Sequence, residues 1–328
     1  MKALVTGGGG FLGEALVRAL VARGDTVRTL ARSDYPGLTA LGVETLRGDL
    51  SDAAAVERAC LGVDVVFHTA AKAGGWGRAE DFEATNVTGT RHVLDACAKN
   101  AVKALVYTST PSVVHAHRDL EGENESLPYA EHFTADYPRT KAIAERAVRA
   151  AKVPSVSIRP HFIWGPGDHH LLPRLLARAR AGRLRQVGSR DVKTDTVFVD
   201  NCVQAHLLAA DALLAGKVSG NPVYFVSDDA PVGVWTMANR MLAAAGAPKV
   251  GKPIPAWVAS AVGATLEGVH ALFSIEKEPL MTRFAASELS HAQWFDISAI
   301  KRDLGYAPKV TLDEGFAKLE AWCREHRP

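Results

Sequence analysis

Tyr137 and Lys141 are the two side chains of this sequence whose types and spacing best suit proton transfer. They bound a Tyr-x-x-x-Lys motif, so on a helix they stand one turn apart on the same face. A free phenol has a pKa near ~10 and transfers protons slowly at neutral pH. A neighbouring ammonium group and the positive end of a helix both favour the phenolate, which predicts a lowered pKa for Tyr137. The pair therefore predicts acid–base chemistry on a bound small molecule, although an isolated match is more often a surface tyrosine.

Hydroxyl groups follow a predicted strand upstream of this pair, in the run YTSTPS that begins at Tyr107. Open parallel sheets bind their ligands at the carboxyl ends of the strands, which is where this run lies. A hydroxyl there can hold a carbonyl oxygen and share the negative charge that develops on it. Ser109 and Thr110 are the candidates, because one of them must point up from the strand and the other into the packing.

A glycine-rich turn follows the first predicted strand and reads TGGGGFLG from Thr6. Gly7, Gly10 and Gly13 fit the pattern TGxxGxxG, and Phe11 and Leu12 open the amphipathic helix that follows. Small residues allow a sharp turn, close approach of a pyrophosphate to the backbone amides, and close packing of helix on strand. The helix amino terminus adds free N–H groups and a positive dipole end. This context predicts a dinucleotide site rather than a turn without a ligand.

The end of the second predicted strand decides which nicotinamide cofactor is bound. An NAD site carries an acidic residue there, about 20 residues beyond the loop, whereas this chain has Ala31 followed by Arg32. A 2′-phosphate meets no repelling anion and gains a guanidinium partner, so NADP(H) is predicted over NAD(H). The alternative for Arg32 is a solvated surface arginine. Asp49 and Leu50 follow the third strand and are predicted to contact the adenine.

The elements that must position these residues alternate between strand and helix. Short apolar runs predict strands at Ala3–Thr6, Thr26–Leu30, Glu44–Arg47, Val63–His68, Ala104–Ser109, Ser155–Arg159 and Pro222–Ser227. Helical spacing occurs at Leu12–Ala22, Ala53–Ala59, Thr88–Lys99, Ala142–Ala151 and Leu171–Ala181. This alternation predicts an α/β fold with a doubly wound parallel sheet of the Rossmann type, buried on both faces.

The pattern changes after Gly165, and helices are expected to dominate beyond Pro231. We predict a cofactor-binding domain at residues 1–165, with returning segments in about 190–230, and a smaller, mainly helical substrate lobe at 166–189 and 231–328. The apolar stretch Ala256–Ile275 has helical spacing and is expected to bury one face against this lobe. With Trp164 it is a candidate lining for an alkyl groove, and contact with a membrane surface is the alternative.

Composition narrows the function classes further. The 328 residues are 47% hydrophobic and 23% charged, with a formal net charge of +2, so the sequence favours a folded protein and gives no reason to expect nucleic acid as a partner. The chain starts directly with a strand-like run rather than a signal segment, so we expect a cytoplasmic location. The cysteines Cys60, Cys97, Cys202 and Cys323 are expected to be reduced thiols.

A metal site is not expected. His115 and His117, and separately His169 and His170, lie in predicted loops and lack a four-ligand spacing.

Taken in order, these motifs resemble the extended short-chain dehydrogenases, and within them the 3β-hydroxysteroid dehydrogenase-like branch. The resemblance covers nearly the whole chain and rests on TGxxGxxG, Asp49-Leu50, His68-Thr69-Ala70-Ala71, Asn86-Val87-Thr88-Gly89-Thr90, Ser109-Thr110, the Tyr-x-x-x-Lys motif and Arg159-Pro160. The stretches LVTGGGGFLG, AAKAGGWG, YTSTPSV, WGPGD, RLRQVG and PLMTRF are similar to the β-keto acid reductases of bacterial long-chain olefin biosynthesis.

This resemblance implies NADPH-dependent reduction of the C3 ketone of a 2-alkyl-3-oxoalkanoate to the 3-hydroxy acid. It implies that Tyr137 donates the proton and that Lys141 also binds the nicotinamide ribose. It favours Thr110 over Ser109 as the hydroxyl that holds the carbonyl, and it adds Ala70, Asn86 and Pro160 to the cofactor site. Lys72 departs from the usual small residue, and its role is left open.

The resemblance also implies partners. A homodimer is expected through the helices near Thr88–Lys99 and Ala142–Ala151, together with an assembly with the β-lactone-forming and decarboxylating enzymes of the olefin pathway. The substrate is expected to be a β-keto acid with long alkyl chains, whose carboxylate needs a cation. Arg190, Lys193 and Arg283 are the candidates in the later half of the chain, although each is more often just a solvated cation.

Three alternatives stay open at this point. One is a 3β-hydroxysteroid or sterol-type dehydrogenase, the activity after which the resembled branch is named; the direction of the reaction also stays open, because alcohol oxidation and ketone reduction share every residue named above. Another is a nucleotide-sugar epimerase or dehydratase that retains NAD, although the acidic residue usual at position 31 or 32 is absent. The last is a non-catalytic NADP(H) sensor, although such proteins often lose the tyrosine or the lysine.

Overall fold

The computed structural model describes residues 1–115 and 117–328, and its centre is a seven-stranded sheet in which every pair of neighbours is parallel. The strand order is β12-β7-β5-β4-β1-β2-β3. The strands are β1 (Lys2–Thr6), β2 (Thr26–Ala31), β3 (Glu44–Arg47), β4 (Val65–His68), β5 (Ala104–Thr108), β7 (Ser155–Pro160) and β12 (Val223–Val226). The order reverses between β1 and β4, which creates a crevice at the carboxyl ends of these strands where ligands bind.

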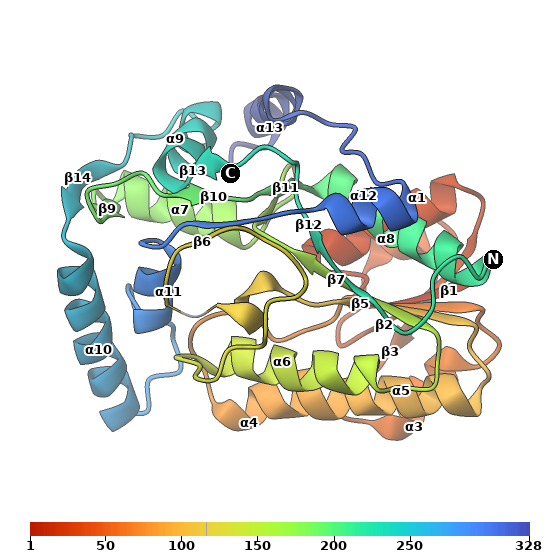
Figure 1. Cartoon of the computed structure of the whole chain (residues 1–328). Helices are drawn as coiled ribbons and strands as arrows, with labels where there is room; N and C mark the ends of the chain where they lie inside the picture. The colour runs from red at the N-terminus through yellow and green to blue at the C-terminus, as the bar shows by residue number, and fades with distance from the viewer. Residues whose placement is uncertain (116) are drawn as a thin grey trace.

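Helices cover both faces of this sheet (Figure 1). One face carries α1 (Phe11–Ala22) and α8 (Val199–Leu214), and the other carries α3 (Ala53–Cys60), α5 (Gly89–Lys99) and α6 (Asp136–Arg149). Alternate strand residues feed the two cores: Val5 of β1 packs with the α1 and α8 side, and Leu4 packs with the α3, α5 and α6 side. The prediction of a doubly wound parallel sheet buried on both faces is therefore confirmed.

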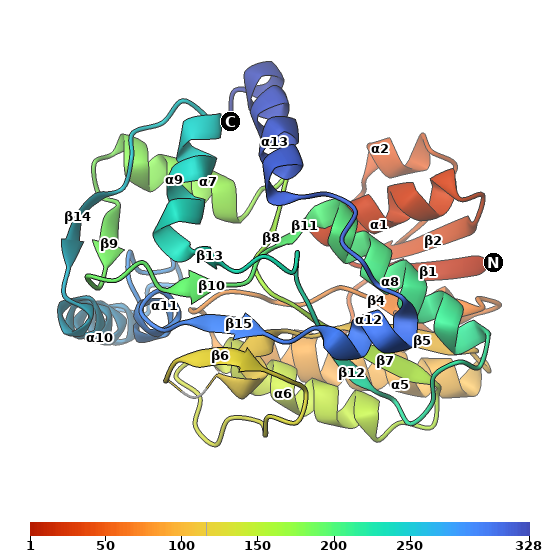
Figure 2. The ribbon, with the colours of Figure 1, turned by 45° about the horizontal axis from the view of Figure 1, so that its top comes forward.

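The lobe beyond the strand ends combines helices with short strands (Figure 2). Its helices are α7 (Leu171–Arg180), α9 (Val234–Ala244), α10 (Ala256–Leu272) and α11 (Arg283–Glu288), and the chain ends with α12 (Ser298–Leu304) and α13 (Leu312–His326). The short strands are β6 (Leu120–Glu123), β8 (Ile163–Trp164), β9 (Arg185–Val187), β10 (Lys193–Thr194), β11 (Val197–Phe198), β13 (Val232–Gly233), β14 (Gly251–Ile254) and β15 (Gln293–Phe295). Strands of two to four residues carry no readable period, so the sequence predicted a lobe made mainly of helices.

Short helical segments complete the fold, namely α2 (Pro36–Thr39), α4 (Ala79–Phe82), the π-helix η1 (Glu83–Thr88) and the 3-10 helix η2 (Pro111–Val114). The π-helix runs directly into α5, so the helix expected at Thr88–Lys99 begins earlier than its apolar spacing indicated. The four cysteines are free and buried, which agrees with the expectation of reduced thiols.

The apolar helix α10 departs from expectation. Only Ala259 and Gly263 of α10 are buried, while Trp257 is 74% exposed and Leu272 is 78% exposed. The expectation that one face of this helix is buried in the lobe is therefore wrong, because its buried contact is confined to these two small residues, and the larger apolar side chains have no neighbours within residues 1–115 or 117–328 that cover them. Within the residues that the structure describes, no helix is both long and apolar enough to cross a membrane.

Candidate active site

A cavity of about 890 Å³ opens at the carboxyl ends of the parallel strands, between the sheet and the lobe. The glycine loop, the ends of β2, β4, β5 and β7, helix α6, and residues of α7, α9 and α11 all contribute to its wall. The predicted site residues that line it are Gly7, Gly10, Phe11, Leu12, Gly13, Arg32, Asp49, Leu50, Ala70, Ser109, Thr110, Tyr137, Lys141 and Pro160. The fold thus brings almost all of them to one crevice.

The glycine loop is packed so closely that Gly7 and Gly13 leave no room for a side chain. A Cβ on Gly13 would lie 2.1 Å from the Gly7 carbonyl oxygen, and one on Gly7 would lie 2.8 Å from the Ala70 Cα. Gly7 also has φ +71°, a left-handed conformation that favours glycine. Gly10 precedes the first residue of α1, so the free amides of that helix face the cavity. This open cradle of amides fits the pyrophosphate of a dinucleotide.

Gly13→Ala tests the cradle. The new methyl group must displace the backbone of Gly7, which is not a movable side-chain end, so the loop opens. We expect NADPH affinity to fall at least about tenfold and stability to fall by about 1–3 kcal/mol. Fluorescence titration of NADPH and a thermal melt measure both effects. Gly24→Ala, at a surface turn with open space around it but φ +85°, is the control that alters stability alone. Unchanged NADPH affinity in Gly13→Ala would remove the cradle from the cofactor site.

The part of the cavity at the carboxyl ends of β2 and β3 suits an adenosine that carries a 2′-phosphate. Arg32 is exposed at the end of β2 and lines the cavity, where its charge helps to lower the pKa of Asp49. The backbone amide and hydroxyl of Ser51 are the main causes of that lowering. Leu50 lines the same end and offers an apolar surface for the adenine.

Tyr137 lies near the start of α6 and lines the cavity together with Thr110, the N-cap of the short helix η2. Burial raises the pKa of Tyr137 to about 12; the Thr110 hydroxyl opposes this rise, and the charge of Glu288 adds to it. The expected lowering of this pKa by Lys141 is therefore wrong for this arrangement, because desolvation outweighs every favourable partner. A phenol with a raised pKa stays protonated at neutral pH, which is the form that donates a proton.

The side chain of Lys141 extends toward the carboxyl end of β5. Its Nζ donates to the Thr108 carbonyl oxygen at 2.6 Å and lies 4.1 Å from the centre of the Tyr107 ring. Burial lowers the pKa of Lys141 to about 7, and the carboxylate of Glu145 only partly offsets this effect. Lys141 thus occupies the wall of the cavity beside Pro160, where it can reach the ribose of a bound nicotinamide nucleotide.

The strand-end hydroxyls divide into two roles. Thr110 accepts a hydrogen bond from the Ser112 backbone amide at 3.2 Å and donates to the Ser112 hydroxyl at 3.3 Å. Ser109 also lines the cavity, but its hydroxyl helps to lower the pKa of the buried Glu145 on α6. The geometry favours Thr110 as the hydroxyl that faces a carbonyl oxygen together with Tyr137. Ser112 lines the cavity as well, and sequence reasoning missed it because it lies beyond the strand.

Asn86 does not line the cavity, so direct contact with the cofactor stays a prediction. It is buried in η1, where its side chain accepts from the Lys72 amide at 2.8 Å and donates to the Thr140 hydroxyl at 3.0 Å. It ties the loop after β4 to the catalytic helix α6. Lys72 pairs with Asp81 at 2.8 Å and lies over the Phe82 ring, which gives this unusual lysine a structural partner outside the cavity.

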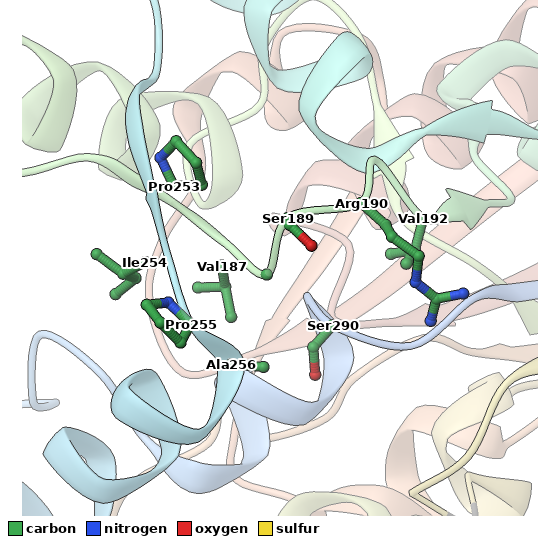
Figure 3. A pocket seen from close by; sticks show the side chains of 10 residues that line it. Val187, Ser189, Arg190, Val192, Pro253, Ile254, Pro255, Ala256 and Ser290 are labelled. Carbon is green, nitrogen blue, oxygen red and sulfur yellow. The ribbon is translucent and has the colours of Figure 1, made fainter.

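The three cations proposed for carboxylate recognition do not line the large cavity. Arg190 pairs with Asp119 at 3.2 Å and borders a separate groove of about 490 Å³ with Ser189 and Ser290 (Figure 3). Arg283 pairs with Glu267 at 2.6 Å, and Lys193 is exposed on β10. The expectation is wrong because all three cations lie outside the cavity. Both arginines already have an acidic partner, which spacing along the chain does not show. In contrast, Trp164 does line the cavity, whereas α10 does not.

The histidine pairs have other partners. His115 and His117 each share a hydrogen bond with the Ser287 hydroxyl, at 2.9 and 2.8 Å. Asp168 accepts backbone hydrogen bonds from the first residues of α7, including Leu172 at 2.8 Å. Across residues 1–115 and 117–328, no group of three or more metal-ligating side chains is placed to hold an ion.

Comparison with known proteins agrees with this geometry. Residues 4–254 match the model of the 3-beta hydroxysteroid dehydrogenase/isomerase family. A 2-alkyl-3-oxoalkanoate reductase of Stenotrophomonas maltophilia is 47% identical over 98% of this chain and 99% of its own length. A second protein of that name, from Shewanella oneidensis, is 45% identical over 97% of this chain and 85% of its length. A 3-beta-hydroxysteroid dehydrogenase of Mycolicibacterium neoaurum is 31% identical over 97% and 90%.

Solved structures share the same architecture. The crystal structure of gox2253 superposes with a TM-score of 0.78 at 26% identity and covers 99% of this chain and 98% of that one. MoeE5 in complex with UDP-glucose and NAD superposes with a TM-score of 0.76 at 22% identity over 99% of both chains. At this identity the second likeness concerns the fold, a doubly wound sheet in which a dinucleotide occupies the crevice.

Proposed function

This chain belongs to the 3-beta hydroxysteroid dehydrogenase/isomerase family of nicotinamide-dependent oxidoreductases, and from that premise we propose that it is an NADPH-dependent reductase of 2-alkyl-3-oxoalkanoates. The product is the 2-alkyl-3-hydroxyalkanoate, formed in the biosynthesis of long-chain olefins. The two relatives named for this reduction support the substrate class. The observation that carries the proposal is that Tyr137, Thr110 and Lys141 line one cavity together with the glycine loop.

The side chains suggest how the protein reduces a ketone. Bound NADPH supplies the hydride to the C3 carbon. Thr110 and Tyr137 hold the ketone oxygen, on which negative charge develops, and Tyr137 donates its phenolic proton to that oxygen. The raised pKa of Tyr137 keeps the proton in place until the oxygen gains charge. Lys141 lines the same cavity as Tyr137 and orders the ribose of the cofactor.

Preference for NADPH rests on Arg32. A guanidinium at the end of β2, without an acidic neighbour at position 31, suits a 2′-phosphate. A hydrogen bond to a charged group contributes about 1.5–3 kcal/mol, so Arg32→Ala is expected to raise the KM for NADPH by about 10–100-fold and to leave the KM for NADH unchanged. Arg47→Ala, an exposed arginine at the end of neighbouring β3, is the matched control. An equal loss for both cofactors would show that Arg32 does not read the phosphate.

Long alkyl chains require an apolar wall, and the lobe provides one. The apolar side chains that line the cavity from this side are Trp164, Leu171, Leu175, Leu184, Val234, Trp235, Met237, Met241, Phe284 and Leu289. Methionine and leucine adapt to flexible chains at little cost, which suits alkyl groups of variable length. This lining supports a substrate with two hydrocarbon branches.

A steroid ketone is the second candidate, because a 3-beta-hydroxysteroid dehydrogenase is 31% identical over nearly the whole chain. NADPH consumption with 2-alkyl-3-oxo acids of increasing chain length, measured beside a steroid ketone, separates the two. We expect rates that rise with chain length for the acids and negligible rates for the steroid. Flat, negligible rates on the acids with turnover of the steroid would contradict the proposed substrate.

We also propose assembly states that follow from this function. Helices α5 and α6 lie side by side on one face of the sheet, and we propose that a homodimer forms through them (Figure 1). We further propose a cytoplasmic location, with peripheral contact at a membrane surface, and an association with the β-lactone-forming and decarboxylating enzymes that consume the hydroxy acid. Sedimentation of the purified protein at several concentrations tests the dimer.

A further inference from the structure

The wall of the cavity beside Tyr137 contains a buried carboxyl group that the mechanism above does not use. Glu288 is the last residue of α11, lines the cavity and is 8% exposed. Among the described residues its Oε1 atom has no hydrogen-bond partner. Its charge raises the pKa of Tyr137, so the carboxyl group lies within electrostatic reach of the phenol.

Two buried polar side chains lie next to this carboxyl group, and a third adjoins those two. His115 places its Nε2 atom 3.9 Å from Oε1 of Glu288, and the Gln293 amide lies beside the same carboxyl group. The His161 ring lines the cavity and packs against the backbone of Gln293. In the described part of the chain, His161 Nε2, His115 Nδ1 and both amide atoms of Gln293 also have no partner. We call Glu288, His115, His161 and Gln293 the Glu288 cluster.

Unpartnered polar atoms are rare in protein interiors, because each loses its hydrogen bonds to water. Here several of them gather at one place, and two of their side chains, those of Glu288 and His161, form part of the cavity wall. A ligand that fills this end of the cavity therefore meets donors and acceptors that have no competing partner. The Glu288 cluster therefore forms a polar subsite next to the place where Tyr137 and Thr110 would hold the ketone.

The cluster holds no positive charge at neutral pH. The titratable groups that face Glu288 are His115 from the end of η2 and Tyr137 from α6, and His161 from the end of β7 lies close to His115. Burial lowers the pKa of His115 to about 4 and that of His161 to about 3, so both rings are neutral. Lys141 donates to the Thr108 carbonyl oxygen instead. A carboxylate bound here would meet neutral N–H donors and the carboxyl group of Glu288.

We propose that the Glu288 cluster binds the carboxyl group of the substrate, with one proton shared between Glu288 and the substrate carboxylate. This inference rests on the proposed function. In a 3-oxo acid the carboxyl carbon is only two bonds from the ketone carbon, so a ketone held by Tyr137 and Thr110 brings the carboxyl group to their immediate surroundings. Glu288 and His161 line the cavity there, whereas the three arginine and lysine candidates lie outside it.

The shared proton follows from electrostatics. Two carboxylates in close contact in a buried site cannot both stay ionised, so binding takes up one proton from the solvent. The proton lies between one oxygen of Glu288 and one oxygen of the substrate, and His161 Nε2 can donate to a remaining oxygen. Burial raises the pKa of Glu288 to about 7, so the uptake of this proton costs little free energy at neutral pH. Above that pH, affinity for the acid should fall about tenfold per pH unit.

Calorimetry on the whole protein with NADPH, which cannot react with the alcohol product, measures the proton directly. The ligands are the stable 2-alkyl-3-hydroxyalkanoate and its methyl ester, titrated at pH 8 in two buffers of different ionisation enthalpy. We expect uptake of about one proton with the acid and none with the ester. Glu288→Gln keeps the shape of the side chain and should bind the acid without proton uptake. Glu278→Gln is the matched control, because Glu278 lines the same cavity but is paired with Arg174 at 2.6 Å.

Turnover separates this inference from the proposed function. Wild-type KM for the acid should rise above about pH 7, and this rise should vanish in Glu288→Gln and persist in Glu278→Gln. Turnover of the acid with no proton uptake by the wild-type protein, or with uptake retained in Glu288→Gln, would overturn the subsite alone. Proton-coupled binding without any turnover of the acid or the ester would overturn the proposed reaction and leave the subsite standing.

Discussion

Replacing Tyr137 by Phe is expected to lower kcat for ketone reduction by about 10²–10⁴-fold, the usual contribution of a positioned proton donor. The variant keeps the half-buried ring in its place at the start of α6 and loses only the hydroxyl group. NADPH binding should stay within about twofold of the wild-type value, because the glycine cradle and Arg32 are untouched. Steady-state rates and a fluorescence titration of NADPH measure the two quantities.

Tyr224→Phe provides the control for this prediction. The Tyr224 hydroxyl donates to Asp303 at 3.1 Å on the far side of β12 and does not line the cavity. Its loss should leave kcat near the wild-type value. Thr110→Val should lower kcat less than Tyr137→Phe, since it removes the second holder of the ketone oxygen and leaves the proton donor. Near wild-type turnover in Tyr137→Phe would remove the tyrosine from the mechanism.

Arg159→Met is expected to destabilise the protein by about 3–5 kcal/mol, because it leaves a buried carboxylate without its partner. Arg159 on β7 donates to Glu145 on α6 from Nε at 3.0 Å, and the two side chains are 2% and 0% exposed. Tyr129 donates to the same carboxylate at 2.7 Å. The pair fixes the catalytic helix to the strand that ends at Pro160, so the loss should also loosen the site.

The loss of stability in Arg159→Met should depend on pH in a definite direction. The guanidinium helps to hold the pKa of Glu145 below its ordinary value, so in the wild type this stabilisation is present above about pH 4.3 and is lost as pH falls. In Arg159→Met, burial raises that pKa and is opposed only by the Tyr129 and Ser109 hydroxyl groups, so the penalty should shrink when pH falls toward 4. Urea unfolding at pH 8 and pH 5 measures the difference.

Two further variants control for the loss of the arginine. Arg18→Met breaks an exposed pair with Glu14 and should cost less than about 0.5 kcal/mol. The double variant Arg159→Met with Glu145→Leu should recover much of the lost stability, since no unpaired charge remains. A penalty for Arg159→Met that is small or equal at both pH values would show that the buried pair does not act through charge.

The fold was predictable because the parallel sheet has a strong signature in the sequence. Strands such as Glu44–Arg47 are found where the pattern put them, and the apolar runs of β4 and β5 are buried on both faces. The small strands of the lobe were missed, because their pairing depends on contacts between segments far apart, as between β15 and β6. Helix α10 was misjudged because an apolar composition does not show which neighbours are present to bury it.

The candidate site was predictable only where a short motif carries it. The glycine loop and the Tyr137–Lys141 pair are local patterns, and both line the cavity. The surroundings of these groups could not be predicted from the local sequence. Burial sets the pKa of Tyr137, and the spacing of residues along the chain does not show how deeply a side chain is buried. Glu288 stands far from the motifs in sequence, and His161 follows Arg159-Pro160 without being part of a motif, so only the packing of the lobe against the strand ends reveals them.

Transfer of deuterium from NADPH labelled at C4 of the nicotinamide tests the central claim most directly. Wild-type protein is incubated with the stereospecifically labelled cofactor of either hand and a 2-alkyl-3-oxoalkanoate, and the product is analysed by mass spectrometry. The account predicts a 2-alkyl-3-hydroxyalkanoate that carries one deuterium at C3 from one of the two labelled cofactors, and its near absence in Tyr137→Phe. NADPH consumption without label at C3, or a labelled product formed equally well by Tyr137→Phe, would contradict it.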